Sequence, residues 1–276
     1  MKTVKTLHEI RSARATLPGP VGFVPTMGYL HEGHLSLVRQ AKAASKSTVV
    51  SIFVNPTQFG PKEDLAKYPR NLERDLALLE SVGVDLVWTP ENQMMYPEGY
   101  QSWVTVEEVS KPLEGSLRPG HFRGVATVVA KLFNGVQADR AYFGQKDAQQ
   151  VAVIRRMVID LNFPVEIIAC PIVREPDGLA MSSRNVYLDH EERNASTVLF
   201  RALMSAKRMF MAGERNAATL RQAMLEILER EPRARVQYAS VAHPESLDEM
   251  EGEIEHALCS LAVYIGKTRL IDNIVL

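Results

Sequence analysis

The sequence predicts an α/β fold with a Rossmann-like, doubly wound parallel sheet, followed by a smaller C-terminal α+β domain. Before Pro171, short β-branched apolar runs alternate with segments of helical periodicity. Such alternation favours parallel strands with helices on both faces of the sheet. After Pro171 the pattern changes to helices followed by strands, and we therefore expect two domains, 1–174 and 175–276.

The chain opens with a predicted strand, helix and second strand. Residues 21–25 and 48–54 are short apolar runs rich in β-branched side chains, and residues 35–41 between them carry apolar side chains at helical spacing. Residues 71–82 then repeat leucines along one helical face, and residues 84–88 form the next strand candidate. The first part of the chain is therefore built from βαβ units.

The alternation continues after an irregular stretch rich in proline and glycine. Residues 125–136 indicate a buried helix and residues 140–143 a short strand. A further helix over 147–161 and a strand over 165–170 complete the predicted parallel sheet.

The C-terminal pattern differs. Residues 190–211 and 217–230 indicate helices, whereas residues 235–241, 258–265 and 268–275 indicate strands. The last two strands are joined closely enough for an antiparallel hairpin.

The net charge limits the classes of binding partner for this chain, and the cysteines indicate its cellular compartment. The 276 residues include 32 basic and 33 acidic side chains, and a net charge of -1 argues against nucleic acid or a membrane surface as a general partner. Cys170 and Cys259 stand in apolar surroundings without metal-ligand spacing, which is typical of buried thiols in a reducing compartment. The first ten residues lack the apolar core of a signal peptide, and no apolar run approaches 18 residues. We therefore expect a cytoplasmic protein.

A phosphate site is predicted at the first strand-to-helix crossover, in residues 25–34. His31 and His34 flank Gly33 at the start of the helix, where unpaired N–H groups and the helix dipole favour an anion. Surface or core histidines would give the same short match. A zinc-protease motif does not fit, because its second histidine comes four positions after the first.

Two further segments follow predicted strands, where α/β enzymes place functional residues. Gln58, in the segment 55–60, can donate to and accept from a polar substrate, although an ordinary turn would look alike. Lys146 stands at a helix start, where a cation is most useful if an anion binds, and Asp147 is an N-cap or a magnesium ligand.

Two loop segments have both a structural and a functional interpretation. Residues 117–124 are either structural punctuation before a helix or a substrate wall that includes Arg118 and His121. Residues 177–185 are either a polar linker between the domains or a mobile clamp for a triphosphate. The familiar GxGxxG and P-loop motifs do not occur.

Taken together, these motifs resemble the pantothenate synthetases, the pantoate–β-alanine ligases of the HxGH nucleotidyltransferase superfamily. The resemblance runs over most of the first 190 residues and rests on several ordered segments: 25–28 with 31–34, 53–59, 120–124, 146–150 and 181–185. Gln145 departs from the family pattern, in which glutamate is common, and this leaves the role of that side chain in doubt.

The resemblance implies a two-step reaction and the residues that serve it. Pantoate and ATP would give pantoyl adenylate and pyrophosphate, after which β-alanine would displace AMP. The implied ATP site comprises Met27, Gly28, Tyr29, Leu30, His31, Glu32, Gly33, His34, Gly144, Gln145, Lys146, Asp147, Val173, Met181, Ser182, Ser183 and Arg184. Catalysis would fall to His31, His34, Lys146, Ser182, Ser183 and Arg184, with His34 as proton donor to the phosphates.

Other expectations are less specific. Gln58 and Gln150 would hold pantoate, with Asn55, Arg118 and His121 as further candidates for binding the two acids. Mg²⁺ would bridge the phosphates, with Asp75 and Asp147 as candidate ligands. The junction loop and residues 59–68 would shield the adenylate from water, although 59–68 could equally be a static surface loop. A homodimer is also implied by the resemblance.

Two alternative functions stay open from the sequence. Another HxGH adenylyltransferase would transfer the nucleotide to a phosphate acceptor and stop there. A non-catalytic ATP-sensing module would bind ATP without releasing pyrophosphate.

Overall fold

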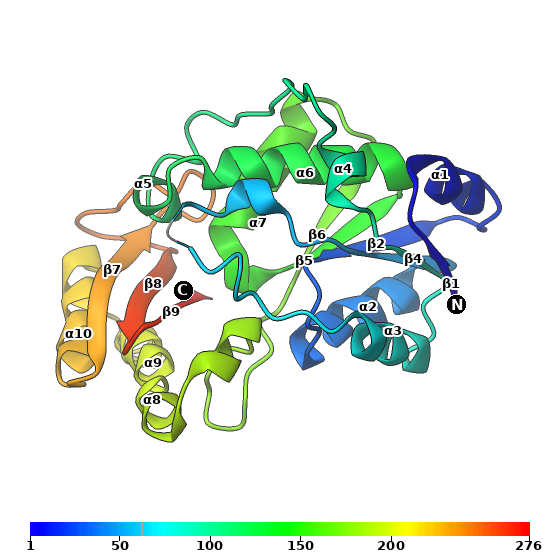
Figure 1. The fold of residues 1–276 in the computed structure, drawn as a ribbon. Helices are drawn as coiled ribbons and strands as arrows, with labels where there is room; N and C mark the ends of the chain where they lie inside the picture. Colours follow the sequence, from blue (N-terminus) through cyan, green and yellow to red (C-terminus); the bar gives the residue numbers. More distant parts are fainter. Residues whose placement is uncertain (62) are drawn as a thin grey trace.

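The larger of two sheets contains six parallel strands in the order β1-β4-β3-β2-β5-β6 (Figure 1). The computed structural model describes residues 1–61 and 63–276. The strand bounds are β1 Lys2–Val4, β2 Val21–Thr26, β3 Ser47–Ile52, β4 Leu86–Trp88, β5 Arg140–Gly144 and β6 Glu166–Cys170. The predicted parallel α/β sheet is therefore confirmed, with the short edge strand β1 as an addition.

Helices cover both faces of this sheet because neighbouring strand residues point to opposite sides. Phe23 packs in one core with residues of helices α1 and α6, whereas the adjacent Val24 packs with helices α2 and α3 on the other face. In Figure 1, α1, α6 and α7 lie above the sheet and α2 and α3 below it. These helices are α1 Leu7–Ala15, α2 Glu32–Ala44, α3 Leu72–Ser81, α6 His121–Val136 and α7 Ala148–Asp160.

The C-terminal part has its own core between an antiparallel sheet and helices. The sheet has the order β7-β8-β9, and β8 and β9 form the predicted hairpin. The elements are α8 His190–Ala195, α9 Val198–Met211, α10 Ala217–Glu229, β7 Ala234–Ala242, β8 Leu258–Ile265 and β9 Thr268–Val275. This arrangement confirms the predicted smaller α+β region.

The single helix predicted over 190–211 is wrong, since α8 ends at Ala195 and α9 begins at Val198. Between them, the hydroxyl of Ser196 donates to the carbonyl of Arg193 at 2.6 Å, and that of Thr197 donates to Asn194 at 2.9 Å. Such side chains compete with the helical backbone hydrogen bonds and here interrupt the helix.

Among the described residues, helix α1 and five shorter helices were not predicted, and most of the shorter ones belong to the functional segments. The five shorter helices are η1 Pro56–Gln58, α4 Asn92–Met95, α5 Glu114–Leu117, η2 Gln145–Asp147 and η3 Ser183–Tyr187.

A crevice opens between β2 and β5, where the order of the strands reverses. The two strands are neighbours, with Gly22 opposite Arg140 and Phe23 opposite Ala141. From β2 the chain continues to β3 and β4 on one side, and from β5 to β6 on the other. Ligands of α/β proteins bind at the carboxyl ends of strands at such a switch point, which places the segments after β2 and β5 at the candidate site.

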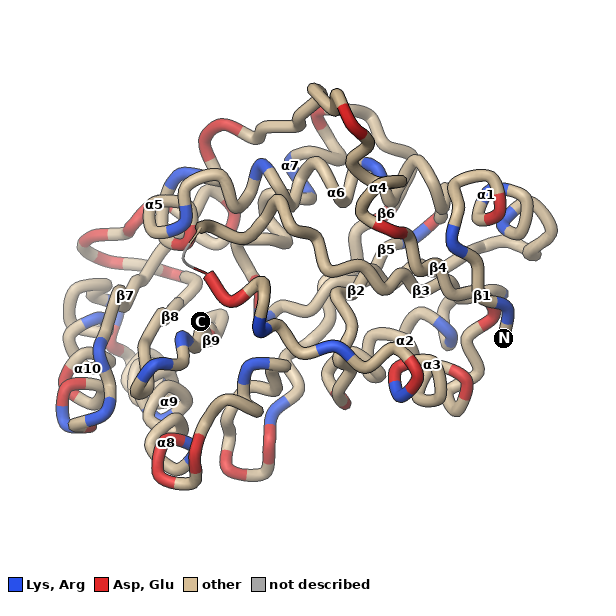
Figure 2. The backbone as a smooth tube through the Cα atoms, in the orientation of Figure 1, with Lys and Arg blue, Asp and Glu red and all other residues tan. Residues whose placement is uncertain are grey.

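The C-terminal sheet lies beside this crevice, and both signs of charge border the space between the two sheets (Figure 2). Cys170 and Cys259 are both buried, as expected, and are not in a disulfide. Within the described ranges, no helix is long and apolar enough to span a membrane.

Candidate active site

The turn after β2 is held in shape by Asp75. The backbone N–H groups of Tyr29 and Leu30 donate to its two carboxylate oxygens at 2.7 and 2.8 Å, and Asp75 is only 1% exposed. Gly28 takes a φ of 81° here, a conformation that glycine adopts without a steric penalty. Asp75, one of the two candidate magnesium ligands, therefore supports the turn, and amide hydrogens already bind both of its oxygens.

His31 and His34 stack at the N-terminus of α2 with their ring centroids 4.1 Å apart. The Nδ1 of His31 accepts the N–H of Gly33 at 3.2 Å, and the Nδ1 of His34 accepts the N–H of His31 at 3.3 Å. Since each Nδ1 is an acceptor, the proton of each neutral ring is on Nε2.

The surroundings of the two rings keep them neutral. Burial, together with the charge of Lys146, lowers the pKa of His31 to about 4. Burial also lowers the pKa of His34 well below its ordinary value, and His31 and Lys146 lower it further. Both rings can therefore donate from Nε2 to an anion near neutral pH.

Lys146 lies after β5 in the turn η2, and β9 fixes this turn. The side-chain amide of Asn273 donates to the carbonyls of Gln145 and Lys146, both at 2.9 Å. The Lys146 ammonium is 3.5 Å from the Asp147 carboxylate, and the lysine side chain is 20% exposed. A largely buried cation thus stands at the mouth of the crevice.

The junction segment contributes two hydroxyls and a guanidinium. Ser183 donates to the carbonyl of Tyr29 at 3.3 Å, and Ser182 caps η3 by accepting the N–H of Arg184. Arg184 donates to both oxygens of Asp64 at 2.9 and 3.0 Å. Burial opposes the charge of Asp64, but the hydrogen bonds and charge of Arg184 hold the pKa of Asp64 below its ordinary value.

Gln58 lies in η1, which packs closely on α6. A Cβ at Gly124 would lie 2.7 Å from the backbone nitrogen of Gln58, so only glycine permits this contact. Asn55 donates its amide to the Gln58 Oε1 at 3.0 Å and to the Gly124 carbonyl at 3.1 Å. The Gln58 amide nitrogen contacts the sulfur of Met27 at 3.1 Å, a weak acceptor that an oxyanion can replace.

Arg118 and His121 support this segment. Arg118 donates to both oxygens of Glu63 at 2.7 and 2.8 Å, and His121 Nδ1 lies 2.8 Å from the carbonyl of Gln58. The Arg118 guanidinium is thus already paired with a carboxylate.

Most of the predicted site residues line one cavity of about 230 Å³. These are Met27, His31, Gly33, His34, Asn55, Gln58, Arg118, His121, Gly144, Lys146, Asp147, Gln150, Val173, Met181, Ser182, Ser183 and Arg184. The remaining predicted residues, which do not line it, are Gly28, Tyr29, Leu30, Glu32, Asp75 and Gln145. Glu32 is instead exposed and forms an ion pair with Arg39.

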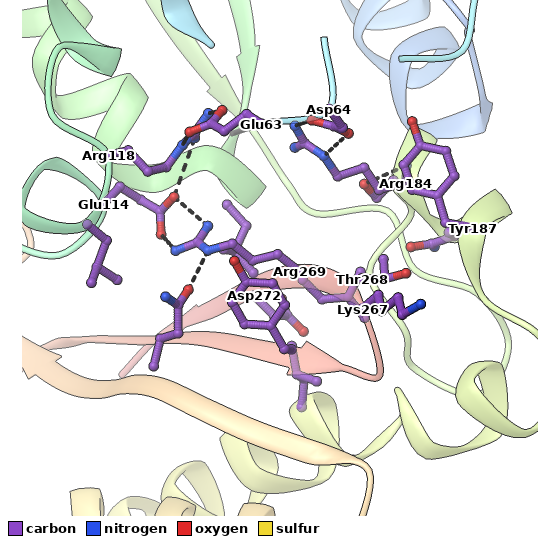
Figure 3. Close-up of a pocket in the computed structure, with 18 of the residues that line it drawn as sticks. Glu63, Asp64, Glu114, Arg118, Arg184, Tyr187, Lys267, Thr268, Arg269 and Asp272 are labelled. Atoms are coloured by element: carbon purple, nitrogen blue, oxygen red, sulfur yellow. Dashed lines mark hydrogen bonds and ion pairs between the residues drawn. The ribbon is translucent and has the colours of Figure 1, made fainter. Parts of the chain in front are cut away.

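A larger cavity of about 880 Å³ adjoins the first one and extends to the C-terminal sheet. Figure 3 shows residues from the walls of this larger cavity. The larger cavity also reaches Arg269 of β9, and the walls of the two cavities share Arg118, Lys146, Asp147, Ser182 and Arg184. Segments far apart in the chain therefore surround one continuous space with their cations.

The family model for pantoate-beta-alanine ligase matches residues 1–275. The chain belongs to the pantoate-beta-alanine ligase family. The pantothenate synthetase of Roseiflexus sp. (strain RS-1) is 62% identical over 276 residues, which cover 100% of this chain and 99% of that protein. The sequence resemblance is thereby confirmed.

Solved structures of this ligase family have the same fold. The pantothenate synthetase of Thermus thermophilus is 51% identical, with a TM-score of 0.95 and coverage of 99% of each chain. The pantoate-beta-alanine ligase of Francisella tularensis, complexed with beta-gamma ATP and beta-alanine, is 34% identical with a TM-score of 0.81. That likeness covers 100% of this chain and 97% of the other.

Three residues in or beside the two cavities were not predicted individually from the sequence. Asp64 pairs with Arg184, Tyr68 lines the smaller cavity, and Asn273 holds the Lys146 turn. Asp64 and Tyr68 fall within the segment 59–68 that we expected near the site, whereas no local pattern marks Asn273.

The described residues do not form a dedicated metal site, since no three His, Cys, Asp or Glu side chains gather as a ligand set in 1–61 and 63–276. Asp147, the other candidate ligand, lies in the walls of both cavities. Mg²⁺ is characteristically held by phosphate oxygens and water with one or two carboxylates, so this donor set suits an ion that arrives with its nucleotide.

Proposed function

We propose that this chain catalyses the ATP-dependent condensation of pantoate with β-alanine to pantothenate, through a pantoyl adenylate and with release of AMP and pyrophosphate. One observation carries the proposal: the smaller cavity places the His31–His34 pair and Lys146 together with the amides of Gln58 and Gln150. The two histidines and the lysine can donate hydrogen bonds to a polyphosphate. The two amides can donate to and accept from a hydroxy acid.

In the first step, the pantoate carboxylate attacks the α-phosphorus of ATP, and the bond to the β,γ-pyrophosphate breaks. The attacking group is already ionised and needs no base. Two anions must approach, and negative charge grows on the leaving pyrophosphate, so positioned cations and N–H donors lower the barrier. Lys146 and Arg184 supply the cations, and the Nε2–H groups of His31 and His34 supply donors.

In the second step, the amine of β-alanine attacks the acyl carbon of the adenylate and expels AMP. The amine must be unprotonated, and its proton passes to water. Gln58 and Gln150 hold the pantoyl group, and Asn55 orients the Gln58 amide. Residues 1–174 would supply most of the groups that bind ATP and pantoate, and residues 175–276, which include Ser182, Ser183 and Arg184, would cover the site and exclude water from the adenylate.

Mg²⁺ would accompany ATP, with Asp147 as its candidate protein ligand. The proposal also includes a homodimer and a cytoplasmic location, both implied by the family. Sedimentation of the purified protein and cell fractionation would test these two parts.

The direct test combines the purified protein with ATP, Mg²⁺, pantoate and β-alanine and follows AMP and pyrophosphate, omitting each acid in turn. We expect pyrophosphate to depend on pantoate, and AMP release to depend on both acids. Release of ADP would contradict an adenylate. Binding of ATP without pyrophosphate would support the ATP-sensing alternative, and a product that still carries the nucleotide would support an adenylyltransferase.

A further inference from the structure

Glu114 is a buried carboxylate between the two sheets, outside the ATP and acid contacts described above. It is 5% exposed, and both of its oxygens accept hydrogen bonds from Arg269 of β9, at 2.6 and 2.7 Å. The hydroxyl of Tyr238 in β7 also donates to it at 3.0 Å. Figure 3 shows Glu114 and Arg269 pointing toward each other beside the larger cavity. Glu114 therefore joins the C-terminal sheet to the N-terminal part.

The backbone fixes Glu114 firmly on the N-terminal side. Its N–H donates to the Gln149 side chain at 3.0 Å, and Gln149 in turn donates to the carbonyls of Val109 and Pro112. The preceding Leu113 has a φ of 51°, which is uncommon for a leucine. Strained conformations of this kind persist where the surrounding structure determines them, often near functional sites.

Arg118 continues the contacts from Glu114 toward the substrate cavity. Its Nη1 lies 3.5 Å from the Glu114 carboxylate and 3.1 Å from the Nε2 of His121. Its Nε and Nη2 bind Glu63. The guanidinium is thus held by two carboxylates and presents one N–H edge to His121.

His121 completes the connection. Its Nδ1 must donate to the Gln58 carbonyl at 2.8 Å, so its Nε2 is the acceptor for Arg118. Burial and the Arg118 charge lower the pKa of His121 to about 4, which keeps this neutral form in place near pH 7. The position of Gln58 therefore depends on a contact chain that begins at β9.

We propose that Glu114 is a positioning residue, which couples the C-terminal sheet to Gln58 through Arg118 and His121 and so sets the affinity for the hydroxy acid. This inference rests on the proposed function, in which Gln58 binds pantoate. In this inference Glu114 does not contact a substrate and acts only through Arg118 and His121.

The test compares the wild type with Glu114→Gln, Arg269→Gln and the double variant, by steady-state kinetics and thermal unfolding. Glu114→Gln removes one carboxylate charge and leaves Arg269 without its partner, so we expect a lower Tm. We also expect the KM for pantoate to rise about tenfold, a typical effect of breaking a coupling network, while the KM for ATP changes less than about twofold.

The double variant separates positioning from stability. It restores the charge balance, so Tm should recover at least in part, whereas the broken connection should keep the KM for pantoate high. A KM that returns to the wild-type value together with Tm would overturn the inference. The inference would also be overturned if Arg269→Gln changed the KM for ATP but left the KM for pantoate unchanged.

Glu249→Gln is the control for breaking an arginine–carboxylate pair at a more exposed carboxylate. Glu249 also holds an arginine, Arg221, and accepts from Ser240 and from the backbone of Val241 in β7, but no described contact connects it to Gln58. We expect it to lower Tm without changing the KM for pantoate. If it raises this KM as much as Glu114→Gln does, the inference fails while the proposed function stands. A wild type that makes no AMP from pantoate and β-alanine would overturn both.

Discussion

At the scale of single residues, the chemistry depends most on two neutral histidines, His31 and His34, that lie beside the charged Lys146. His31 and His34 each use Nδ1 as an acceptor, and their lowered pKa values leave the positive charge on Lys146. A neutral donor and a fixed cation do not repel each other, so both can face the same phosphate. This division of roles suits a site that must stabilise charge without a change in protonation.

His34→Ala and Lys146→Ala should lower kcat far more than stability. Loss of one preorganised donor typically costs about 3 kcal/mol of transition-state stabilisation, or roughly a hundredfold in rate. Turnover and Tm measured on the same preparations check this, with His8→Ala at an exposed position of α1 as the control. Turnover near the wild-type level in both site variants would refute the assigned roles.

Asp64→Asn should tighten the binding of ATP. Asp64 occupies Arg184 through two hydrogen bonds, so the phosphates of ATP must compete with it. Removing a partly exposed ion pair of about 1 kcal/mol should lower the Kd for ATP about fivefold.

Calorimetric titration with ATP measures the effect of Asp64→Asn. The control is Asp177→Asn, because Asp177 of the junction segment also binds an arginine through both of its oxygens, here Nη1 and Nη2 of Arg193 in α8. Unchanged or weaker ATP binding in Asp64→Asn would show that the pair does not compete with the nucleotide.

Residues in local motifs could be predicted from sequence, whereas residues defined by distant partners could not. His31 and His34 are three positions apart, and their spacing at a helix start carries the information. Asn273 and Gln145 are 128 positions apart, and Arg184 and Asp64 are 120 apart. Only the fold brings such pairs together, so Asn273 and the Asp64 contact needed the structure.

At the scale of secondary-structure elements, α6 determines where the acid-binding segment lies. The helix begins at His121, four residues earlier than predicted, and this first turn holds both His121 and Gly124 against η1. The periodicity of apolar residues predicted the buried part of α6 but not this first turn, because its contacts are polar. The N-terminal helix α1 was missed although Thr6 and Glu9 form its capping box.

Gly124→Ala should weaken acid binding more than ATP binding. The added methyl group would meet the backbone of Thr57 and Gln58, so η1 must move away from α6. We expect a severalfold rise in the KM for pantoate and a loss of stability of about 1–3 kcal/mol from overpacking. Kinetics and urea unfolding measure these effects, with Asn134→Ala at an exposed position of α6 as the control. Equal effects on both substrates would argue against a local displacement of η1.

At the scale of the whole molecule, the sequence predicted two regions of different topology but not how they join. Hydrophobic periodicity reports which faces are buried, and it served well for the parallel sheet and for the C-terminal hairpin. The junction instead depends on Arg269 with Glu114 and on Arg174 with Asp272, a residue that is 3% exposed. Paired charges carry no periodic signal, and their partners lie far apart in the chain.

The stability of the whole chain should fall as the pH is lowered from 7 to 5. His31 and His121 have pKa values of about 4 when folded, whereas an unfolded histidine has a pKa near 6.5. The unfolded state therefore binds more protons between these values, and the stability present above about pH 6.5 is lost as the pH falls toward 4. Each histidine should contribute about 2 kcal/mol to this loss between pH 7 and 5.

Urea unfolding at pH 7 and pH 5 measures this loss. His121→Gln should lose about 2 kcal/mol less than the wild type over the same interval, because one buried titrating group is removed. His8→Gln, which removes an exposed histidine, should follow the wild type. A His121→Gln variant with the full wild-type pH dependence would contradict the assignment.

The contacts of β9 also bear on the order of events during biosynthesis. Asn273 and Arg269 leave the ribosome after β2, β5 and the junction segment, and domains generally fold in the order in which they emerge. A nascent chain could thus build the six-stranded sheet while the turn that carries Lys146 still lacks its anchoring amide. Until β9 has emerged, the Lys146 turn lacks the two hydrogen bonds from Asn273, so the last strand to be made is the one that fixes this cation at the crevice.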